Sequence, residues 1–216
     1  MRTAAILPVK SFGAAKQRLG ELMEQDARSR LMRAMLADVL DALARVPELD
    51  QVLVVTANPL AGEPEGDARI RVLHDDREEG QSAAALIGVA HAREQGFERV
   101  LMVPGDAPLL DPGELSALLA RPEPLVIVPD RHGTGTNGLS LRPVDAFDPA
   151  FGPGSLARHE TAARATGLEY AVDRLPSLVL DVDTPDDLEA TAAALETSEG
   201  GAPATRAALR RLSLPA

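Results

Sequence analysis

Short apolar segments recur along the chain, and their length and composition fit the strands of a buried sheet. The clearest reads Val52-Leu53-Val54-Val55, without the alternation of apolar and polar residues that marks a half-exposed strand. Such runs are expected where helices cover both faces of a parallel sheet. The pattern predicts strands at Ala4 to Leu7, Gln51 to Thr56, Ile70 to His74, Arg99 to Pro104, Leu125 to Pro129 and Leu178 to Val182.

Between these runs, hydrophobic residues recur at helical spacing. One apolar stripe repeats every four residues, at Leu31, Met35, Val39 and Leu43. The alanine-rich segment from Ser82 to Glu94 ends before Gly96, a common helix stop. Another helix is expected from Pro185 to Leu195, with Thr184 as its cap. Because strands and helices alternate, the sequence predicts a three-layer α/β fold with a mainly parallel sheet.

The composition favours one domain followed by a flexible C-terminal tail. The 216 residues are 45% hydrophobic and only 2% aromatic, so the core must consist mainly of aliphatic side chains. From Thr197 the chain is rich in Ser, Glu, Gly, Ala and Pro, a composition typical of a flexible tail. We therefore expect a catalytic domain over residues 1–196 and a flexible tail over 197–216.

Other features of the composition indicate where the protein works. The chain has no cysteine, which excludes disulfides, thiolate metal sites and a cysteine nucleophile and fits the reducing cytosol. It has neither a signal-peptide pattern nor an apolar stretch of ~18 residues that would span a membrane. The sequence thus predicts a cytoplasmic protein without membrane contact.

The distribution of positive charge indicates a phosphate-binding loop. With a net charge of −11, most of the surface should repel nucleic acid, so a polyanionic ligand needs a locally basic pocket. The only lysines in the chain are Lys10 and Lys16, and with Arg18 they follow the first predicted strand. A flexible ammonium suits a phosphate at that place. The alternative is that two surface lysines lie close together by chance.

Carboxylates follow two other predicted strands. In parallel α/β sheets, ligands bind at the carboxyl ends of the strands, where Asp106, Asp181 and Asp183 are expected. Asp181 and Asp183 would share a face of an extended segment. Carboxylates together with phosphate oxygens and water suit Mg²⁺, and the three residues are predicted to bind it. The alternative for Asp183 is that it or Thr184 merely caps the following helix.

Two glycine-containing segments suit an acidic phosphate. Thr136 and Asn137 offer a hydroxyl and an amide in a glycine-rich loop, where backbone N–H groups can approach an anion. Gly152 precedes Ser155, which is expected to cap a helix whose N-terminus favours a negative group. The alternative is a hairpin loop followed by an ordinary capped helix. His159 lies one turn into that helix, but a lone histidine is more often structural.

Six motifs in order give the chain a family resemblance that spans residues 4–195. They are Pro8-Val9-Lys10 with Lys16-Gln17-Arg18-Leu19, Gly80-Gln81-Ser82-Ala83-Ala84-Ala85, Asp106-Ala107-Pro108-Leu109-Leu110, Gly135-Thr136-Asn137-Gly138-Leu139, Phe151-Gly152-Pro153-Gly154-Ser155 with His159, and Asp181-Val182-Asp183-Thr184. In these motifs the chain resembles the guanylyltransferases of deazaflavin coenzyme F(420) biosynthesis. It departs from them at Gln81-Ser82, where the family usually has Leu-Asn, and at Ala107, where Leu is common.

The resemblance implies a fold, a reaction and a site. The fold would be the Rossmann-like α/β fold of nucleotide-diphospho-sugar transferases. The reaction would transfer GMP from GTP to a three-carbon phospho-acid, phosphoenolpyruvate or 2-phospho-L-lactate, and release pyrophosphate; an actinobacterial likeness favours phosphoenolpyruvate. Asp106, Asp181 and Asp183 would bind Mg²⁺ or Mn²⁺. The phosphates would meet Lys10, Lys16 and Arg18, the guanine base Gly80, Gln81 and Ser82, and the acid Thr136, Asn137, Gly152 and Ser155.

Other functions stay open at this point. A nucleotidyltransferase of the same fold could act on a sugar phosphate or a molybdopterin-like acceptor. A non-catalytic regulator would bind GTP and release no pyrophosphate. A glycosyltransferase is less favoured, because its Asp-x-Asp motif normally follows an early strand and Asp181-Val182-Asp183 follows the last one. The tail carries arginines beside leucines and is a candidate docking segment for the next transferase of the pathway; a homodimer is left open.

Overall fold

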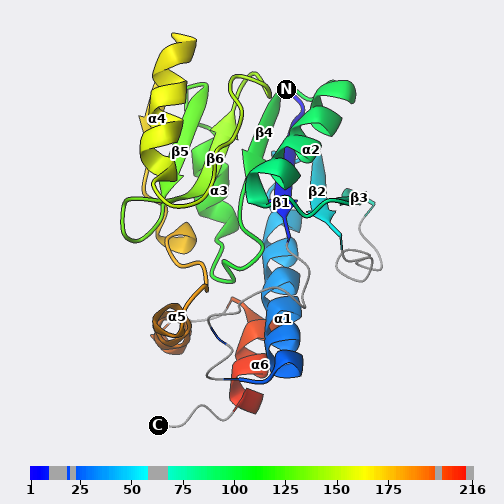
Figure 1. Ribbon diagram of the computed structural model, residues 1–216, viewed down its shortest axis with the longest axis vertical. Helices are drawn as coiled ribbons and strands as arrows, with labels where there is room; N and C mark the ends of the chain where they lie inside the picture. The colour runs from blue at the N-terminus through cyan, green and yellow to red at the C-terminus, as the bar shows by residue number, and fades with distance from the viewer. Residues whose placement is uncertain (10–18, 20–22, 58–67, 198–200, 213–216) are drawn as a thin grey trace.

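The computed structural model describes residues 1–9, 19, 23–57, 68–197 and 201–212. Helices and strands alternate along most of this length (Figure 1). The strands are β1 (Thr3–Pro8), β2 (Gln51–Thr56), β3 (Ile70–His74), β4 (Arg99–Met102), β5 (Leu125–Pro129), β6 (Thr136–Leu141) and β7 (Tyr170–Val172). The helices are α1 (Gln25–Ala44), α2 (Gln81–Glu94), α3 (Pro112–Leu119), α4 (Ser155–Thr166), α5 (Pro185–Thr197) and α6 (Pro203–Leu212), with a 3-10 turn η2 (Pro176–Leu178).

The strands form one mixed sheet in the order β3-β2-β1-β4-β6-β5-β7. Every neighbouring pair is parallel except the two pairs that involve β6, which is antiparallel to both β4 and β5. The sequence prediction of a mainly parallel α/β sheet is therefore confirmed. This arrangement brings the carboxyl ends of β1, β4 and β5 to the same edge as the start of β6.

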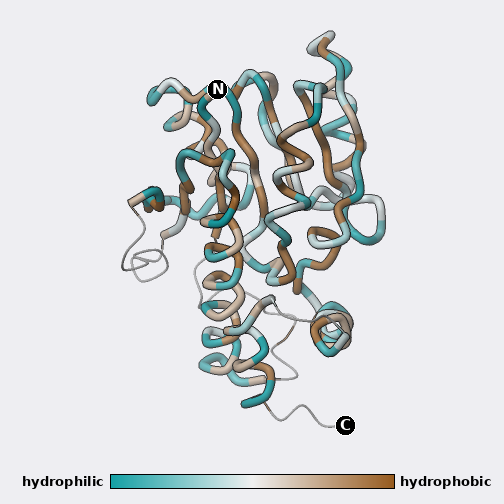
Figure 2. Tube along the Cα trace, turned by 180° about the vertical axis from the view of Figure 1, so that it is seen from behind, coloured by the Kyte–Doolittle hydropathy of each residue, from teal (hydrophilic) through white to brown (hydrophobic). Residues whose placement is uncertain are grey.

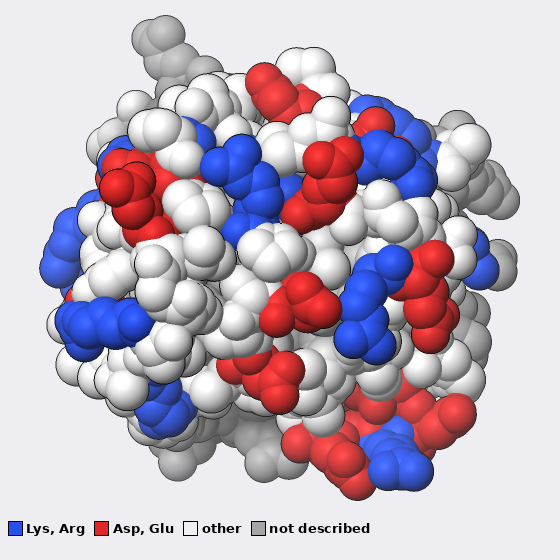
Figure 3. Space-filling model, turned by 90° about the horizontal axis from the view of Figure 1, so that it is seen from above, with Lys and Arg blue, Asp and Glu red and all other residues white. Residues whose placement is uncertain are grey.

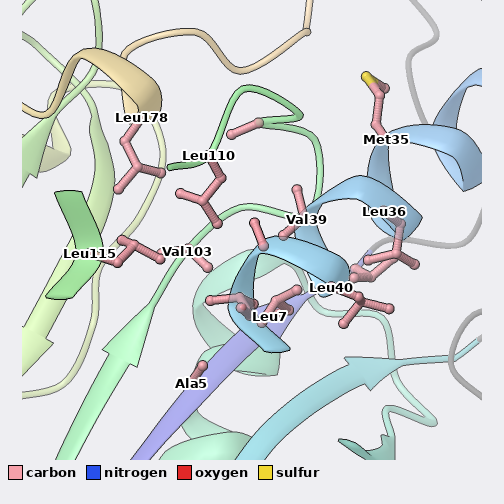
Figure 4. Close-up of a cluster of buried hydrophobic side chains, with 14 of the residues drawn as sticks. Ala5, Leu7, Met35, Leu36, Val39, Leu40, Val103, Leu110, Leu115 and Leu178 are labelled. Atoms are coloured by element: carbon pink, nitrogen blue, oxygen red, sulfur yellow. The ribbon is translucent and has the colours of Figure 1, made fainter. Parts of the chain in front are cut away.

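Alternate residues of the strands face opposite helical layers. Ala5 and Leu7 of β1 pack with α1 and α3 in one core cluster, whereas Ala4 and Ile6 pack with α2 in the other. Figure 4 shows Leu7 beside the apolar side chains of α1, and Figure 2 shows hydrophobic colour along the strands. A Cβ at Gly88 would stand 2.5 Å from Cγ2 of Ile6, so this glycine lets α2 approach the sheet closely. Burial on both faces explains the unbroken apolar runs.

Two segments differ from the sequence predictions. The predicted strand at Leu178 to Val182 is wrong: η2 occupies its start and irregular chain follows. Leu178 and Val182 are both fully buried, so their apolar character reflects core packing without a strand. Thr136 and Asn137, expected in a glycine-rich loop, instead begin the buried strand β6.

The predicted flexible tail is also wrong over residues 203–212. Helix α6 packs along α1, and Figure 1 shows the two helices side by side below the sheet. The Asp38 carboxylate on α1 accepts hydrogen bonds from the backbone N–H groups of Ala204 and Thr205, at 3.1 and 2.7 Å. Leu209 packs against the core cluster that α1 shares with the sheet. A buried carboxylate thus caps the first turn of α6 and fixes it in place.

Figure 3 views the molecule from above, onto the face where β1 begins. Figure 3 shows acidic and basic side chains interspersed on this face. Across the part of the chain that the structure describes, no helix combines the length and apolar character needed to cross a membrane.

Candidate active site

A cavity of about 890 Å³ opens at the carboxyl edge of the sheet. Its size falls within the usual range for small-molecule sites, which is roughly 300–1,000 Å³. Segments from many parts of the fold line it, namely the ends of β1, β3, β4 and β5, the starts of α2, β6 and α4, the segment before and into α5, and Met32 of α1. The topology thus gathers at one place most of the described residues that the sequence assigned to ligand binding, although Ser82 does not line the cavity.

One side of the cavity is acidic. Asp106, Asp181 and Asp183 all line it, as the sequence predicted. The backbone N–H of Val182 donates to the carbonyl of Asp106 at 3.3 Å, which joins the segment after β4 to the segment before α5. Each of the three aspartates makes further interactions. The two segments therefore hold their carboxylates at a common edge.

Asn137 has a different contact from the one that the sequence assigned to it. Its amide nitrogen donates to the carbonyl of Leu178 at 2.8 Å and to Oδ1 of Asp181 at 3.0 Å. The side chain is buried, so both N–H groups are used within the protein. The amide consequently orients the Asp181 carboxylate and ties β6 to η2.

The donor set on this side suits a hard divalent cation. It consists of carboxylate oxygens, and the chain contains no cysteine, so Mg²⁺ or Mn²⁺ fits better than a metal that prefers sulfur. Within the described ranges no three His, Cys, Asp or Glu side chains already converge as a complete metal site. The fit thus rests on the chemistry of the donors and on their shared edge.

Asp187 links this acidic edge to the loop after β5. Its Oδ2 atom accepts from the backbone N–H groups of Asp183 and Thr184 at 3.1 and 2.8 Å, and from the Thr184 hydroxyl at 2.7 Å. Its Oδ1 atom lies 3.0 Å from Nη2 of Arg131. The predicted Thr184 cap is confirmed, because its Oγ1 accepts from the Asp187 N–H at 3.3 Å. Asp187 is therefore a structural carboxylate that fixes the Asp183 backbone and brings an arginine to the cavity.

A second part of the cavity lining consists of uncharged donors. Thr136, Gly152 and Ser155 line it, again as the sequence predicted. Ser155 is 1% exposed, and its hydroxyl has no hydrogen-bond partner in the part of the chain that the structure describes. A buried hydroxyl without a partner costs free energy, on the order of 1–3 kcal/mol. Because Ser155 lines the cavity, a bound ligand is a candidate partner for this hydroxyl.

Ser155 does not cap α4, so that part of the prediction is wrong. Gly154 is the cap residue, with φ of 71°, and Ser155 is the first residue of the helix. Gly152 also has a positive φ, 106°, which an L side chain rarely adopts. The two glycines turn the chain so tightly that the Ser155 side chain enters the wall of the cavity.

His159 lies under this wall and is completely buried. Its Nδ1 is 2.9 Å from Oγ1 of Thr136, and its Nε2 accepts from the backbone N–H of Ala150 at 2.8 Å. Phe147 and Phe151 surround the ring, with centroids at 5.9 and 5.2 Å. Burial, reinforced by the nearby Arg158, lowers the pKa of His159 to about 4, so the imidazole is neutral at ordinary pH.

Arg158 and Ser82 hold the loop that precedes α4. The Arg158 guanidinium donates to the carbonyls of Ala150, Phe151, Gly152 and Pro153. The Ser82 hydroxyl accepts from the Phe151 N–H at 2.9 Å. Ser82, assigned to the nucleotide base from the sequence, therefore links α2 to this loop.

The other residues assigned to the nucleotide are placed as follows. Gly80 and Gln81 line the cavity at the start of α2, and Gly80 has φ of 107°. Lys10, Lys16 and Arg18 lie outside the described residues.

Sequence reasoning missed several residues that line the cavity, namely Asp75, Asp130, Arg131 and Asp187. Asp75 follows β3 and is 6% exposed; its Oδ1 accepts from the N–H of Glu78 at 3.1 Å and from that of Arg77 at 3.3 Å. Asp130 follows β5 and accepts from the Thr134 N–H at 2.9 Å. Their positions directly after strands are the signal that could have indicated them.

The mixed seven-stranded sheet, with a cavity at its carboxyl edge, has the nucleotide-diphospho-sugar transferase fold. The crystal structure of a protein described as such a transferase, from Desulfovibrio desulfuricans G20, superposes with a TM-score of 0.75. It is 20% identical, and the match covers 98% of this chain and 95% of the other.

The family described as "Guanylyl transferase CofC like" matches residues 3–202, and the chain belongs to it. A phosphoenolpyruvate guanylyltransferase from Conexibacter woesei is 48% identical over 98% of this chain and 97% of its own length. A 3-phospho-D-glycerate guanylyltransferase from Phenylobacterium zucineum is 37% identical over 85% and 86%. A 2-phospho-L-lactate guanylyltransferase from Methanothermobacter thermautotrophicus is 37% identical over 87% and 83%. The chain is accordingly a guanylyltransferase.

Proposed function

We propose that this chain transfers GMP from GTP to the phosphate of a three-carbon phospho-acid and releases pyrophosphate. The observation that carries the proposal is the Ser155 hydroxyl, which has no hydrogen-bond partner among the described residues and lines, with Thr136, the same cavity as Asp106, Asp181 and Asp183. A carboxylate edge suits a cation and a triphosphate, whereas neutral donors suit a small anion. The names of the relatives supply the substrate class.

The chemistry needs little from a general base. An oxygen of the acceptor phosphate, already anionic at neutral pH, attacks the α-phosphorus of GTP. The bond between that phosphorus and the oxygen leading to the β-phosphorus breaks, and pyrophosphate leaves with the electron pair. The task of the protein is to align two polyanions and to offset their repulsion, which is the usual role of positioning and electrostatics in phosphoryl transfer.

Thr136, Ser155 and the backbone around Gly152 hold the phosphate and carboxylate of the acid in this proposal. Hydroxyl and N–H donors form strong hydrogen bonds to an anion and need no charge of their own. The rigid loop before α4 keeps these donors in place, since Arg158 fixes four of its carbonyls.

Asp106, Asp181 and Asp183 would bind Mg²⁺, with Mn²⁺ as the alternative. When bound, the cation neutralises charge on the phosphates and supports their in-line arrangement. Asn137 and Asp187 serve this edge indirectly, because they orient the Asp181 side chain and the Asp183 backbone.

The remaining assignments follow the sequence. We assign Gly80 and Gln81 to the guanine nucleotide, because they line the cavity at the start of α2. Lys10, Lys16 and Arg18 keep their proposed role, which is to neutralise the triphosphate and the departing pyrophosphate. The place of the reaction would be the cytoplasm, within coenzyme F(420) biosynthesis.

Phosphoenolpyruvate is the favoured acceptor. The relative with 48% identity carries that name, whereas the relatives named for 3-phospho-D-glycerate and 2-phospho-L-lactate are each 37% identical. All three acids combine a phosphate with a carboxylate on three carbons, so the same cradle can accept each of them.

The test is pyrophosphate release by the full chain with GTP and Mg²⁺. The acceptors are phosphoenolpyruvate, 2-phospho-L-lactate, 3-phospho-D-glycerate and a sugar 1-phosphate, each compared with a reaction that lacks acceptor. We expect release with the phospho-acids and the highest kcat/KM with phosphoenolpyruvate. Release only with the sugar phosphate would overturn the proposal, and so would GTP binding without release under every condition.

A further inference from the structure

We infer that His159 is a positioning residue: by donating a hydrogen bond to the Thr136 oxygen, it leaves the Thr136 O–H as a hydrogen-bond donor toward the cavity. The inference rests on the proposed function and deepens it, because it explains how the protein selects an anion at that wall. It concerns a fully buried histidine whose two ring nitrogens are both within hydrogen-bond distance of named partners.

The protonation of the ring follows from its partners. A backbone N–H can only donate, so Nε2, at 2.8 Å from the nitrogen of Ala150, must carry a lone pair. A neutral imidazole then has its proton on Nδ1. The Nδ1–H group consequently donates to Oγ1 of Thr136, 2.9 Å away. The imidazolium form would set two N–H groups against each other at Ala150, and the ring therefore stays neutral.

The direction of that hydrogen bond determines what Thr136 can do. Its oxygen is the acceptor from His159, so its own hydroxyl proton must point elsewhere. Thr136 is 8% exposed and lines the cavity, so a ligand there meets a hydroxyl whose donor is unused. An anion accepts such a bond, whereas a cation or an N–H donor at the same place would be repelled.

The same ring joins the two halves of the wall. Through Nε2 it holds Ala150 at the start of the loop whose end carries Gly152 and Ser155. Through Nδ1 it holds the first residue of β6. His159 thereby fixes the spacing between the Thr136 and Ser155 hydroxyls without contacting the ligand itself. The buried and otherwise unexplained Ser155 hydroxyl is the second observation that points to an anion here.

Enzyme kinetics with the full chain, GTP and phosphoenolpyruvate tests the inference. Thr136→Val removes the hydroxyl and should raise the acceptor KM about ten-fold or more, because the lost bond involves a charged group. Thr136→Ser retains the hydroxyl and should raise the acceptor KM much less than Thr136→Val does. The KM for GTP should change little in both variants. Equal acceptor KM values for Thr136→Val and the wild type would overturn the inference.

Variants of His159 separate positioning from mere packing. In His159→Asn, the amide nitrogen replaces Nδ1 as a donor to Thr136, whereas His159→Leu has no donor. We expect a larger rise in acceptor KM for the Leu variant, and little further rise when it is combined with Thr136→Val. If His159 acts only in packing, the effects of His159→Leu and Thr136→Val on the acceptor KM should multiply in the double variant. Both His159 variants should then lose kcat in proportion to the loss of folded protein.

The tautomer itself can be measured in the wild-type protein, which avoids any variant that fails to fold. A two-bond ¹H–¹⁵N correlation spectrum of histidine-labelled protein, assigned with His159→Asn, should show a neutral ring protonated on Nδ1. Protonation on Nε2, or an imidazolium at neutral pH, would overturn the inference. If the wild type turns over no phospho-acid, the proposed function fails; the tautomer result still stands or falls by itself.

Discussion

The two sides of the cavity hold charge in opposite ways. The acidic side places Asp106, Asp181 and Asp183 on irregular chain after β4 and before α5, joined by single backbone contacts. The other side offers hydroxyls on the first residues of β6 and α4, next to a buried histidine, and the Asp130 carboxylate lies close to Gly135 beside it. The carboxylates of the acidic side need a bound cation to offset their repulsion of the phosphates. The hydroxyls of the other side need only an anion that accepts their hydrogen bonds.

This difference indicates a division of labour. Carboxylates on irregular chain can adjust to a cation and to a triphosphate that changes shape during the reaction. Donors fixed on regular elements recognise a small rigid anion, because their geometry does not relax to fit other ligands. We therefore expect changes on the acidic side to reduce turnover, and changes on the neutral side to reduce acceptor affinity.

The largest effect is expected for the acidic side. Asp106→Asn and Asp183→Asn should each reduce kcat by about 100-fold or more, since even the partners of metal ligands cost 10–100-fold. The fold should remain intact, as measured by circular dichroism. Asp186→Asn is the matched control, because Asp186 is exposed in the first turn of α5. Near-normal activity of Asp106→Asn at saturating Mg²⁺ would show that this residue is structural.

Ser155→Ala should change the acceptor KM and not kcat. We expect the acceptor KM to rise by roughly ten-fold, as for the loss of a hydrogen bond to a charged group, with kcat much less affected. Ser177→Ala is a close control, because the Ser177 hydroxyl is also buried without a partner but does not line the cavity. If both variants bind the acceptor equally well, the Ser155 hydroxyl has no ligand.

The sequence could predict much of this arrangement, because strands that are buried on both faces leave an unambiguous apolar pattern. Gln51–Thr56 and Leu125–Pro129 were predicted at their observed bounds for that reason. The same pattern failed at Leu178, because an apolar segment can be buried as a turn. The cap of α4 was misplaced by one residue, since the left-handed φ of Gly154 is visible only in three dimensions.

The tail shows a different limit of sequence reasoning. The residues that hold α6 in place are far away in the sequence: Asp38 and Ala204 are 166 positions apart. A short amphipathic segment is only marginally helical by itself, and nothing local indicates its partner. For the same reason nothing local in the sequence indicated supports such as Asp187 and the His159 hydrogen bonds.

Asp38→Ala tests this support with a smaller effect. Loss of the cap should destabilise the protein by about 0.5–2 kcal/mol, measured by urea unfolding, with kcat and both KM values unchanged at low temperature. Asp41→Ala provides the control, because Asp41 on the same helix pairs with Arg45 at the surface and such pairs contribute little. Equal stability of the two variants would mean that α6 does not depend on Asp38.

A further prediction concerns pH. Burial lowers the pKa of His159 to about 4, below its ordinary value of 6.5. Between these values the unfolded chain binds a proton that the folded protein does not, so the stabilisation is complete above pH 6.5 and is lost as the pH falls toward 4. His159→Asn should flatten this dependence of the unfolding free energy, whereas the exposed His132→Asn should keep it. Identical slopes for wild type and His159→Asn would contradict the assignment.

The central claim is that the phosphate of the acid, held by the neutral side, attacks the α-phosphorus of GTP. It is tested most directly by ³¹P NMR and mass spectrometry of the product formed from GTP and phosphoenolpyruvate. We predict two mutually coupled phosphorus resonances, one from the GMP moiety and one from the acid, in a molecule with the mass of both. A product in which GMP is attached to the carboxylate, or free GMP alone, would contradict the account.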